Sequence, residues 1–137
     1  MHPILVAAFQ LSTFSHPLAG CDTATTTRSA ETCMEQQSRA RDDTLRRLAA
    51  VVRSRLDKAT ARSFDSAAVT WNAYRTQACK SVYSFWREGS IRNVQYMSCV
   101  LDLTDERINH LASTYFPPNG LRRDSIAIVF TKNGPRR

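Results

Sequence analysis

The hydrophobic and polar positions after residue 26 repeat with the period of an α-helix. In the first segment the apolar side chains follow one another at spacings of three and four residues, and they are Leu45, Leu48, Val52 and Leu56. No Gly or Pro interrupts the chain from Glu31 to Lys58. The pattern therefore predicts one long helix, and it begins near Thr26 or Thr27, whose hydroxyls suit a helix cap.

A second apolar stripe predicts another helix, which we expect to run to about Arg87. Its inward positions are Ala67, Trp71, Tyr74, Ala78, Val82 and Phe85. The segment 57–65 is interpreted as the turn before this helix, with Asp65 or Ser66 as its cap. Gly89 is expected to end the helix in the left-handed conformation that glycine adopts easily.

A third helix is predicted from about Val94 to Tyr115, with the inward residues Met97, Val100, Leu103, Ile108 and Leu111. Pro117 and Pro118 end the helical part. Residues 125–131 form a short β-type run among basic residues. The expected fold is all-α, an antiparallel bundle of about three main helices, followed by a short irregular or β-like basic tail over 117–137.

Four cysteines, at positions 21, 33, 79 and 99, indicate disulfides and hence export to an oxidising compartment. Sequence alone permits three pairings. A helical hairpin would bring Cys79 opposite Cys99, which favours that pair, and Cys21–Cys33 then follows by elimination. The bundle is therefore expected to be stapled by two disulfides.

The N-terminal segment has the features of an export signal. Residues 2–14 are mostly apolar and too few to span a bilayer, so 1–20 is predicted to be a signal peptide and 21–116 the helical domain. The segment Leu18-Ala19-Gly20-Cys21 looks like a lipoprotein box, in which Cys21 would carry a lipid. Lipidation would leave Cys33 as an odd thiol, and both fates of Cys21 stay open. The predicted location is periplasmic or secreted, with a lipid anchor in one of the two alternatives.

The charge of the chain is +7, from 19 Lys and Arg against 12 Asp and Glu. One face of the first helix is rich in arginine and is either a solvated surface or an anion-binding face, made of Arg39, Arg46, Arg47 and Arg53. Acidic side chains form a candidate surface for a basic protein partner, made of Glu88, Asp102, Asp105 and Glu106. No aromatic stacking platform accompanies the arginines, which argues against nucleic acid.

Side chains spaced four residues apart predict a structural seam between helices, made of Trp71, Tyr74, Arg75 and Arg107. We expect Arg75 to pair with Asp42 or Asp43, and Arg107 to pair with Asp102 or Asp105.

The residues needed for catalysis are missing from the pattern. His110 is the one histidine beyond the predicted signal, and the thiols are expected to be oxidised. Adjacent carboxylates such as Asp42 and Asp43 diverge on a helix, and no Gly-rich phosphate loop is present. Neither catalytic residues, a metal site nor a cofactor is predicted, and the chain is interpreted as a binding module.

Short motifs in a fixed order resemble the LprI-like family of small bacterial envelope domains, named for a lysozyme inhibitor. They are Trp71-x-x-Tyr74-Arg75-x-x-x-Cys79, then Gly89-Ser90-Ile91, Cys99, and Leu103-Thr104-x-x-Arg107-x-x-x-Leu111. The resemblance covers about Cys21 to Leu111. It implies a protein partner, a lysozyme, which the chain would inhibit. The sequence differs from the family pattern at four positions, Arg46, Ala49, Ala68 and Thr76. The alternative is an envelope protein whose arginine face binds anionic lipid, lipopolysaccharide or another acidic polymer.

Overall fold

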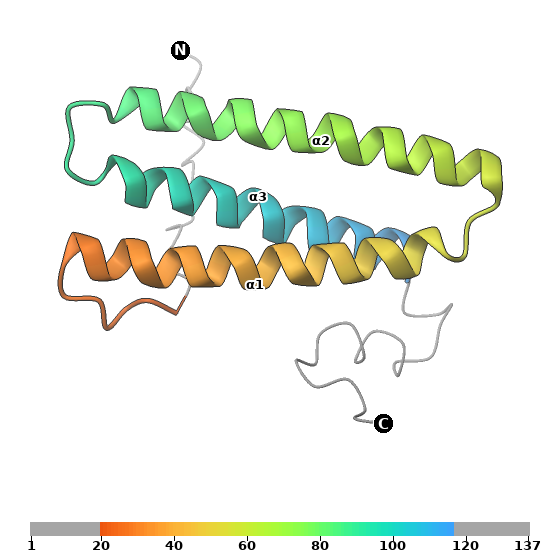
Figure 1. Cartoon of the computed structure of the whole chain (residues 1–137), viewed down its shortest axis with the longest axis horizontal. Coiled ribbons are helices and arrows are strands. Elements are labelled where there is room, and N and C mark those ends of the chain that lie inside the picture. Colours follow the sequence, from red (N-terminus) through yellow and green to blue (C-terminus); the bar gives the residue numbers. More distant parts are fainter. Residues whose placement is uncertain (1–19, 117–137) are drawn as a thin grey trace, which may run out of the picture.

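The computed structural model describes residues 20–116, which form three α-helices and no strand. Helix α1 spans Thr27–Arg53, α2 spans Lys58–Phe85 and α3 spans Arg92–Tyr115. Successive helices run antiparallel, so α1 and α3 point in the same direction (Figure 1). The predicted all-α bundle is thus confirmed. The predicted signal segment and the basic tail lie outside the described residues, except for Gly20.

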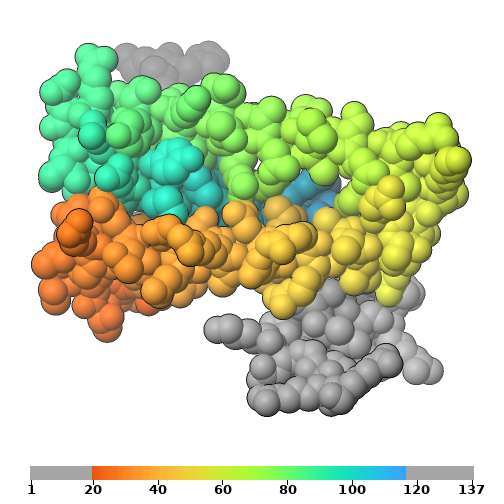
Figure 2. All heavy atoms as spheres, in the orientation of Figure 1, coloured from red at the N-terminus to blue at the C-terminus, as the bar shows by residue number. Residues whose placement is uncertain are grey.

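Helix α3 holds the bundle together. It packs against both α1 and α2, whereas those two helices make almost no direct backbone contact with each other. Atoms of α3 are visible at the bottom of a groove between α1 and α2 (Figure 2). Two ion pairs cross from α1 to α2, Asp42 with Arg75 and Arg53 with Asp65.

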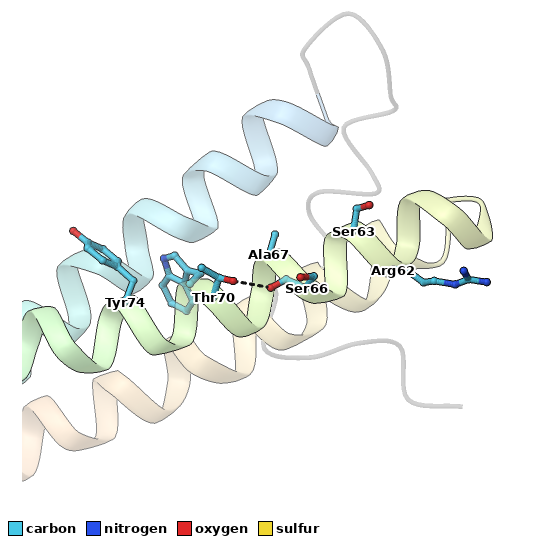
Figure 3. A pocket seen from close by; sticks show the side chains of 7 residues that line it. Arg62, Ser63, Ser66, Ala67, Thr70 and Tyr74 are labelled. Carbon is cyan, nitrogen blue, oxygen red and sulfur yellow. Dashed lines mark hydrogen bonds between the residues drawn. The ribbon is translucent and has the colours of Figure 1, made fainter.

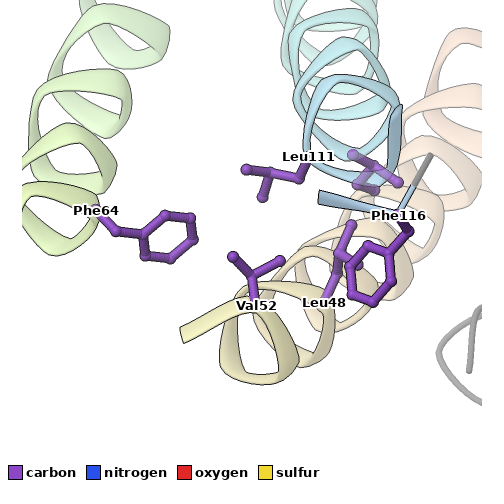
Figure 4. Close-up of a cluster of buried hydrophobic side chains, with 6 residues drawn as sticks. Leu48, Val52, Phe64, Leu111 and Phe116 are labelled. Carbon is purple, nitrogen blue, oxygen red and sulfur yellow. The ribbon is translucent and has the colours of Figure 1, made fainter. Parts of the chain in front are cut away.

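The apolar core is divided into two clusters. The first lies near the α1–α2 turn and draws on all three helices, where Phe64 of α2 points across to Val52 and Leu111 (Figure 4). Its buried members are Leu48, Val52, Phe64, Ile108, Leu111 and Phe116. The second lies toward the starts of α1 and α3 and consists of Cys21, Met34 and Leu101. The sequence pattern missed Leu101 and placed Leu103 inward, although Leu103 is only partly buried.

Helix α1 begins as predicted. Thr26 caps it, because the Ser29 N–H donates to Thr26 Oγ1 and the Thr26 N–H donates to Ser29 Oγ, both at 3.1 Å. The helix ends at Arg53, however, and does not continue to Lys58.

The predicted start of the second helix was wrong by eight or nine residues, which is more than two turns. Helix α2 begins at Lys58 with Asp57 as its cap, so most of the expected turn over 57–65 is helical. Asp57 Oδ1 accepts from the N–H groups of Ala59 at 2.9 Å and Thr60 at 3.1 Å, and the Thr60 hydroxyl donates to Asp57 Oδ2 at 2.6 Å. Ala61 and Phe64 are buried, whereas Ala67, which was predicted to face inward, is exposed.

Replacing Asp57 with alanine is expected to lower the melting temperature by roughly a few degrees, because two N–H groups of α2 lose their acceptor. Asp57→Asn keeps an acceptor and is the matched control. The Thr60 hydroxyl and the two backbone donors hold the pKa of Asp57 below its ordinary value of 3.8. A depressed folded-state pKa stabilises the fold above the unfolded value, so this contribution disappears as the pH falls below about 3.8. Acid titrations of stability that are identical for the wild type and Asp57→Asn would contradict this account.

The end of α2 also differs from the prediction. Phe85 is the last helical residue, and Gly20 is the one glycine with positive φ among residues 20–116, so Gly89 is not a left-handed stop. A Cβ at Gly89 would lie 3.3 Å from the Trp86 carbonyl oxygen, so glycine permits a close turn there. Phe85 itself faces solvent and does not lie on the inward face.

Candidate functional site

A cleft of about 280 Å³ opens between the three helices. Its apolar wall combines residues from each of them, Leu45, Ala49, Phe64, Ala68 and Leu111. Its polar wall consists of Asp42, Arg46, Asn72, Arg75 and Arg107, with Trp71 between the two kinds of surface. Arg46, Ala49 and Ala68, which we interpreted from the sequence as differences from the LprI-like pattern, line this cleft.

Arg75 connects all three helices inside the cleft. Its Nη1 donates to Asp42 Oδ1 of α1 at 2.6 Å and to Thr104 Oγ1 of α3 at 2.8 Å. Thr104 is buried and donates in turn to the Val100 carbonyl at 2.6 Å. The predicted partner Asp42 is therefore the one that Arg75 uses. This polar layer lies between the two apolar clusters, so it fixes how α1 and α2 sit against α3.

Trp71 lies against two guanidinium groups. Arg75 is 4.9 Å and Arg107 is 5.8 Å from the centre of its ring system. The prediction that Arg107 pairs with Asp102 or Asp105 was wrong for residues 20–116, where Asp105 accepts from Arg41 Nε of α1 at 2.9 and 3.0 Å. No ion pair within residues 20–116 involves Arg107. Trp71, Arg75 and Arg107 thus share one site.

Tyr74, the fourth residue of the predicted seam, is 58% exposed and lies outside it. It borders a shallow, open hollow on α2, together with Arg62, Ser63, Ser66, Ala67, Thr70 and Trp71 (Figure 3). The Thr70 hydroxyl donates to the Ser66 carbonyl at 3.1 Å, so it is already bonded within the helix. Small side chains of a single helix line most of this hollow, and it offers little enclosure.

The arginine face of α1 is partly neutralised. Arg39 pairs with Glu35, Arg46 with Asp43, and Arg53 with Asp65. The hydrogen bond from Arg53 lowers the pKa of the Asp65 carboxyl, and the same bond raises the pKa of Arg53. Arg47 has a long contact to the Thr44 hydroxyl at 3.5 Å. Three of the four predicted anion-binding arginines therefore already hold a carboxylate.

The candidate acidic surface is not gathered at one place. Glu88 lies in the α2–α3 turn, and Asp102, Asp105 and Glu106 lie within α3. Asp102 follows the first residue of α3 by ten positions, which corresponds to about 15 Å along a helix. Asp105 is further committed to Arg41.

Two disulfides join the cysteine pairs that the sequence favoured. Cys21 bonds to Cys33 and Cys79 bonds to Cys99, with Cα–Cα distances of 5.9 and 5.6 Å. Cys21 and Cys79 are fully buried. A sulfur in such a bridge cannot also carry a thioether-linked lipid, so the two predicted fates of Cys21 exclude each other.

Sequence reasoning missed a cluster at the α2–α3 turn, where Phe85, Trp86 and Ile91 are exposed. The adjacent aromatics at 85 and 86 carried a usable signal. Neighbouring positions on a helix point about 100° apart, so two adjacent large rings do not both point to the centre of one core.

The comparison with protein families decides the identity of this domain. The family model described as lysozyme inhibitor LprI matches residues 21–111, which include all four cysteines and nearly all of the three helices. The chain belongs to the LprI family. This membership confirms the resemblance seen in the motifs. Comparisons with curated proteins and with solved structures gave no match.

Two general features of this LprI-family domain bear on its chemistry. Residues 20–116 contain no group of three side chains that could hold a metal ion. Over the same residues, none of the helices has the combination of length and apolarity that crossing a bilayer needs.

Proposed function

We propose that this protein is an exported binding module that inhibits a lysozyme. The observation that carries the proposal is the family match, which extends over nearly all of the disulfide-stapled bundle. A family named for lysozyme inhibition supports a lysozyme as the partner. Two disulfides in so small a domain support export, because such bridges persist in the periplasm and outside the cell.

A net charge of +7 would repel a basic enzyme such as a lysozyme, but the charge is unevenly distributed along the chain. Five of the 19 cationic side chains follow residue 116, and they are Arg122, Arg123, Lys132, Arg136 and Arg137. Asp124 is the one acidic residue among them. More than half of the net positive charge therefore belongs to the tail, and the helical domain approaches a basic enzyme against a smaller charge.

The arginine face of α1 gives less support to the alternative of an anionic polymer or membrane, because three of its four candidates hold carboxylates. A membrane location would instead come from a lipid on Cys21. Intact mass after export distinguishes the two: acylation with an odd thiol at Cys33, or an unacylated chain with two bridges.

The proposal is tested by titrating several types of lysozyme with the purified, fully oxidised chain and following the lysis of a cell-wall suspension. We expect activity against at least one type to fall in proportion to added protein and to level off near one inhibitor per enzyme. The reduced and alkylated chain is the matched control and should lose this effect. Full muramidase activity of every lysozyme at a tenfold excess of oxidised protein would overturn the proposal.

A further inference from the structure

We infer that the α2–α3 turn is the surface that enters the catalytic cleft of the inhibited lysozyme, and this inference rests on the proposed function. The surface, here called the aromatic corner, consists of Phe85, Trp86, Arg87, Ile91 and Arg92. It lies at one end of the elongated bundle, where α2 passes into α3 (Figure 1). An end of this kind can enter a recess that the flat side of a helix cannot.

Three large apolar side chains of the corner face solvent. Phe85 is 81%, Trp86 37% and Ile91 38% exposed. The rings of Phe85 and Trp86 meet edge to face with their centroids 5.5 Å apart. A contiguous exposed patch of apolar side chains marks an interaction site on a soluble domain, and Trp is enriched among the residues that dominate binding energies.

The corner stands on a rigid support. The Gly89 N–H donates to the Trp86 carbonyl at 2.8 Å, which closes the turn. Behind it, the Cys79–Cys99 bridge joins the two helices, and Tyr83 of α2 meets Tyr96 of α3 edge to face at 6.1 Å. Arg92 lies over the Tyr83 ring at 5.0 Å. A surface that is already ordered loses little conformational entropy on binding.

The corner is also locally positive. The side chain of Arg87 is 76% exposed, and Arg92 is exposed as well. The start of α3 has no side-chain cap, so its first N–H groups add partial positive charge. Glu88 is the one acidic side chain of the turn, and it lies 3.4 Å from Arg87 Nε. Glu88 offsets one of the two arginines, so these three side chains leave a net charge of +1, which favours an acidic recess.

A lysozyme cleft has the matching chemistry. Lysozymes hydrolyse a glycosidic bond between two carboxyl groups that lie in a cleft shaped for sugar rings. Phe85 and Trp86 would occupy the subsites for the sugars, while Arg87 faces the carboxyl groups. This arrangement also accounts for how a basic inhibitor binds a basic enzyme, because the opposite charge is local to the cleft.

The corner is tested with full-length oxidised variants in the same muramidase assay. Phe85→Ala combined with Trp86→Ala should raise the inhibition constant roughly 100-fold, as expected when two anchoring aromatics are removed. Arg87→Glu should raise it roughly tenfold or more. The matched controls are Val69→Ala, another exposed apolar residue of α2, and Lys58→Glu at the opposite end of α2, both within about threefold of the wild type.

A second readout is competition. A chitin trisaccharide, which occupies the lysozyme cleft, should displace the wild-type inhibitor. The inference is overturned if the folded Phe85/Trp86 double variant inhibits as strongly as the wild type, or if the trisaccharide does not displace the wild-type inhibitor. Either result leaves the proposed function intact. A wild type without inhibition overturns both. If the Phe85/Trp86 double variant lost binding to anionic vesicles but inhibited the lysozyme as well as the wild type does, the corner would be a membrane contact. That result would also overturn the inference.

Discussion

Replacing Cys79 and Cys99 together with alanine is expected to lower the free energy of unfolding by about 3 kcal/mol. The bridge spans 20 positions of sequence and joins α2 to α3, so its loss increases the conformational entropy of the unfolded chain. Cys79 is fully buried, and alanine leaves a small void at its place. Urea unfolding of the oxidised wild type and the double variant measures the difference directly.

The matched variant replaces Cys21 and Cys33, whose separation is 12 positions. Its loss of stability is expected to be somewhat smaller, because a shorter closed loop restricts the unfolded chain less. A Cys79/Cys99 variant within about 1 kcal/mol of the wild type would show that α3 holds α2 without the bridge. Such a result would also remove the rigid support that we assign to the aromatic corner.

Replacing Arg75 with methionine is expected to cost about 2 kcal/mol of stability at neutral pH. Methionine fills much of the same space but cannot donate to Asp42 or to the buried Thr104 hydroxyl. The contribution of the Asp42 pair is discounted, because its carboxylate side chain is 43% exposed and partly screened by water. The hydrogen bond to Thr104 is more protected and accounts for most of the expected loss.

Arg107→Met is the matched control, since Arg107 lies against the same tryptophan without an ion pair in the described part of the chain. Its expected cost is below about 1 kcal/mol. A double-mutant cycle of Arg75→Met with Thr104→Val isolates the hydrogen bond and should give a coupling of about 1 kcal/mol or more. Equal losses for the two arginine variants would mean that contact with Trp71, and not the bond to Thr104, stabilises the seam.

Periodicity and cysteine number were enough to predict the three helices and the two disulfides. The stripe from Leu45 to Leu56 and the cap at Thr26 are local features, and the structure has the cap where the sequence places it. The prediction for the start of α2 was wrong because polar residues such as Asp57 and Thr60 are typical both of a turn and of a helix cap. In the structure they form the cap.

The candidate site was predictable only in part. The spacing of four residues within a helix predicted that Trp71 and Arg75 lie together, and the contact of Trp71 with Arg107 follows from the helical hairpin. The partner of Asp105 depends on the rotation of α1 against α3, which no stripe specifies, so its pairing with Arg41 could not be read from the sequence. The exposure of Phe85 likewise depends on the rotation of α2 against α3, because Tyr83 in the same turn meets Tyr96 of α3 while Phe85 faces solvent.

The central position of α3 has a consequence for the order in which the chain is made. Helix α1 packs mainly against α3, which is synthesised more than thirty residues later. Helix α2 is made first but has little direct backbone contact with α1. A chain that emerges from its N-terminus therefore holds no stable pair of helices until α3 has followed. Under the export that we propose, this delay would keep the chain unfolded while it crosses the membrane.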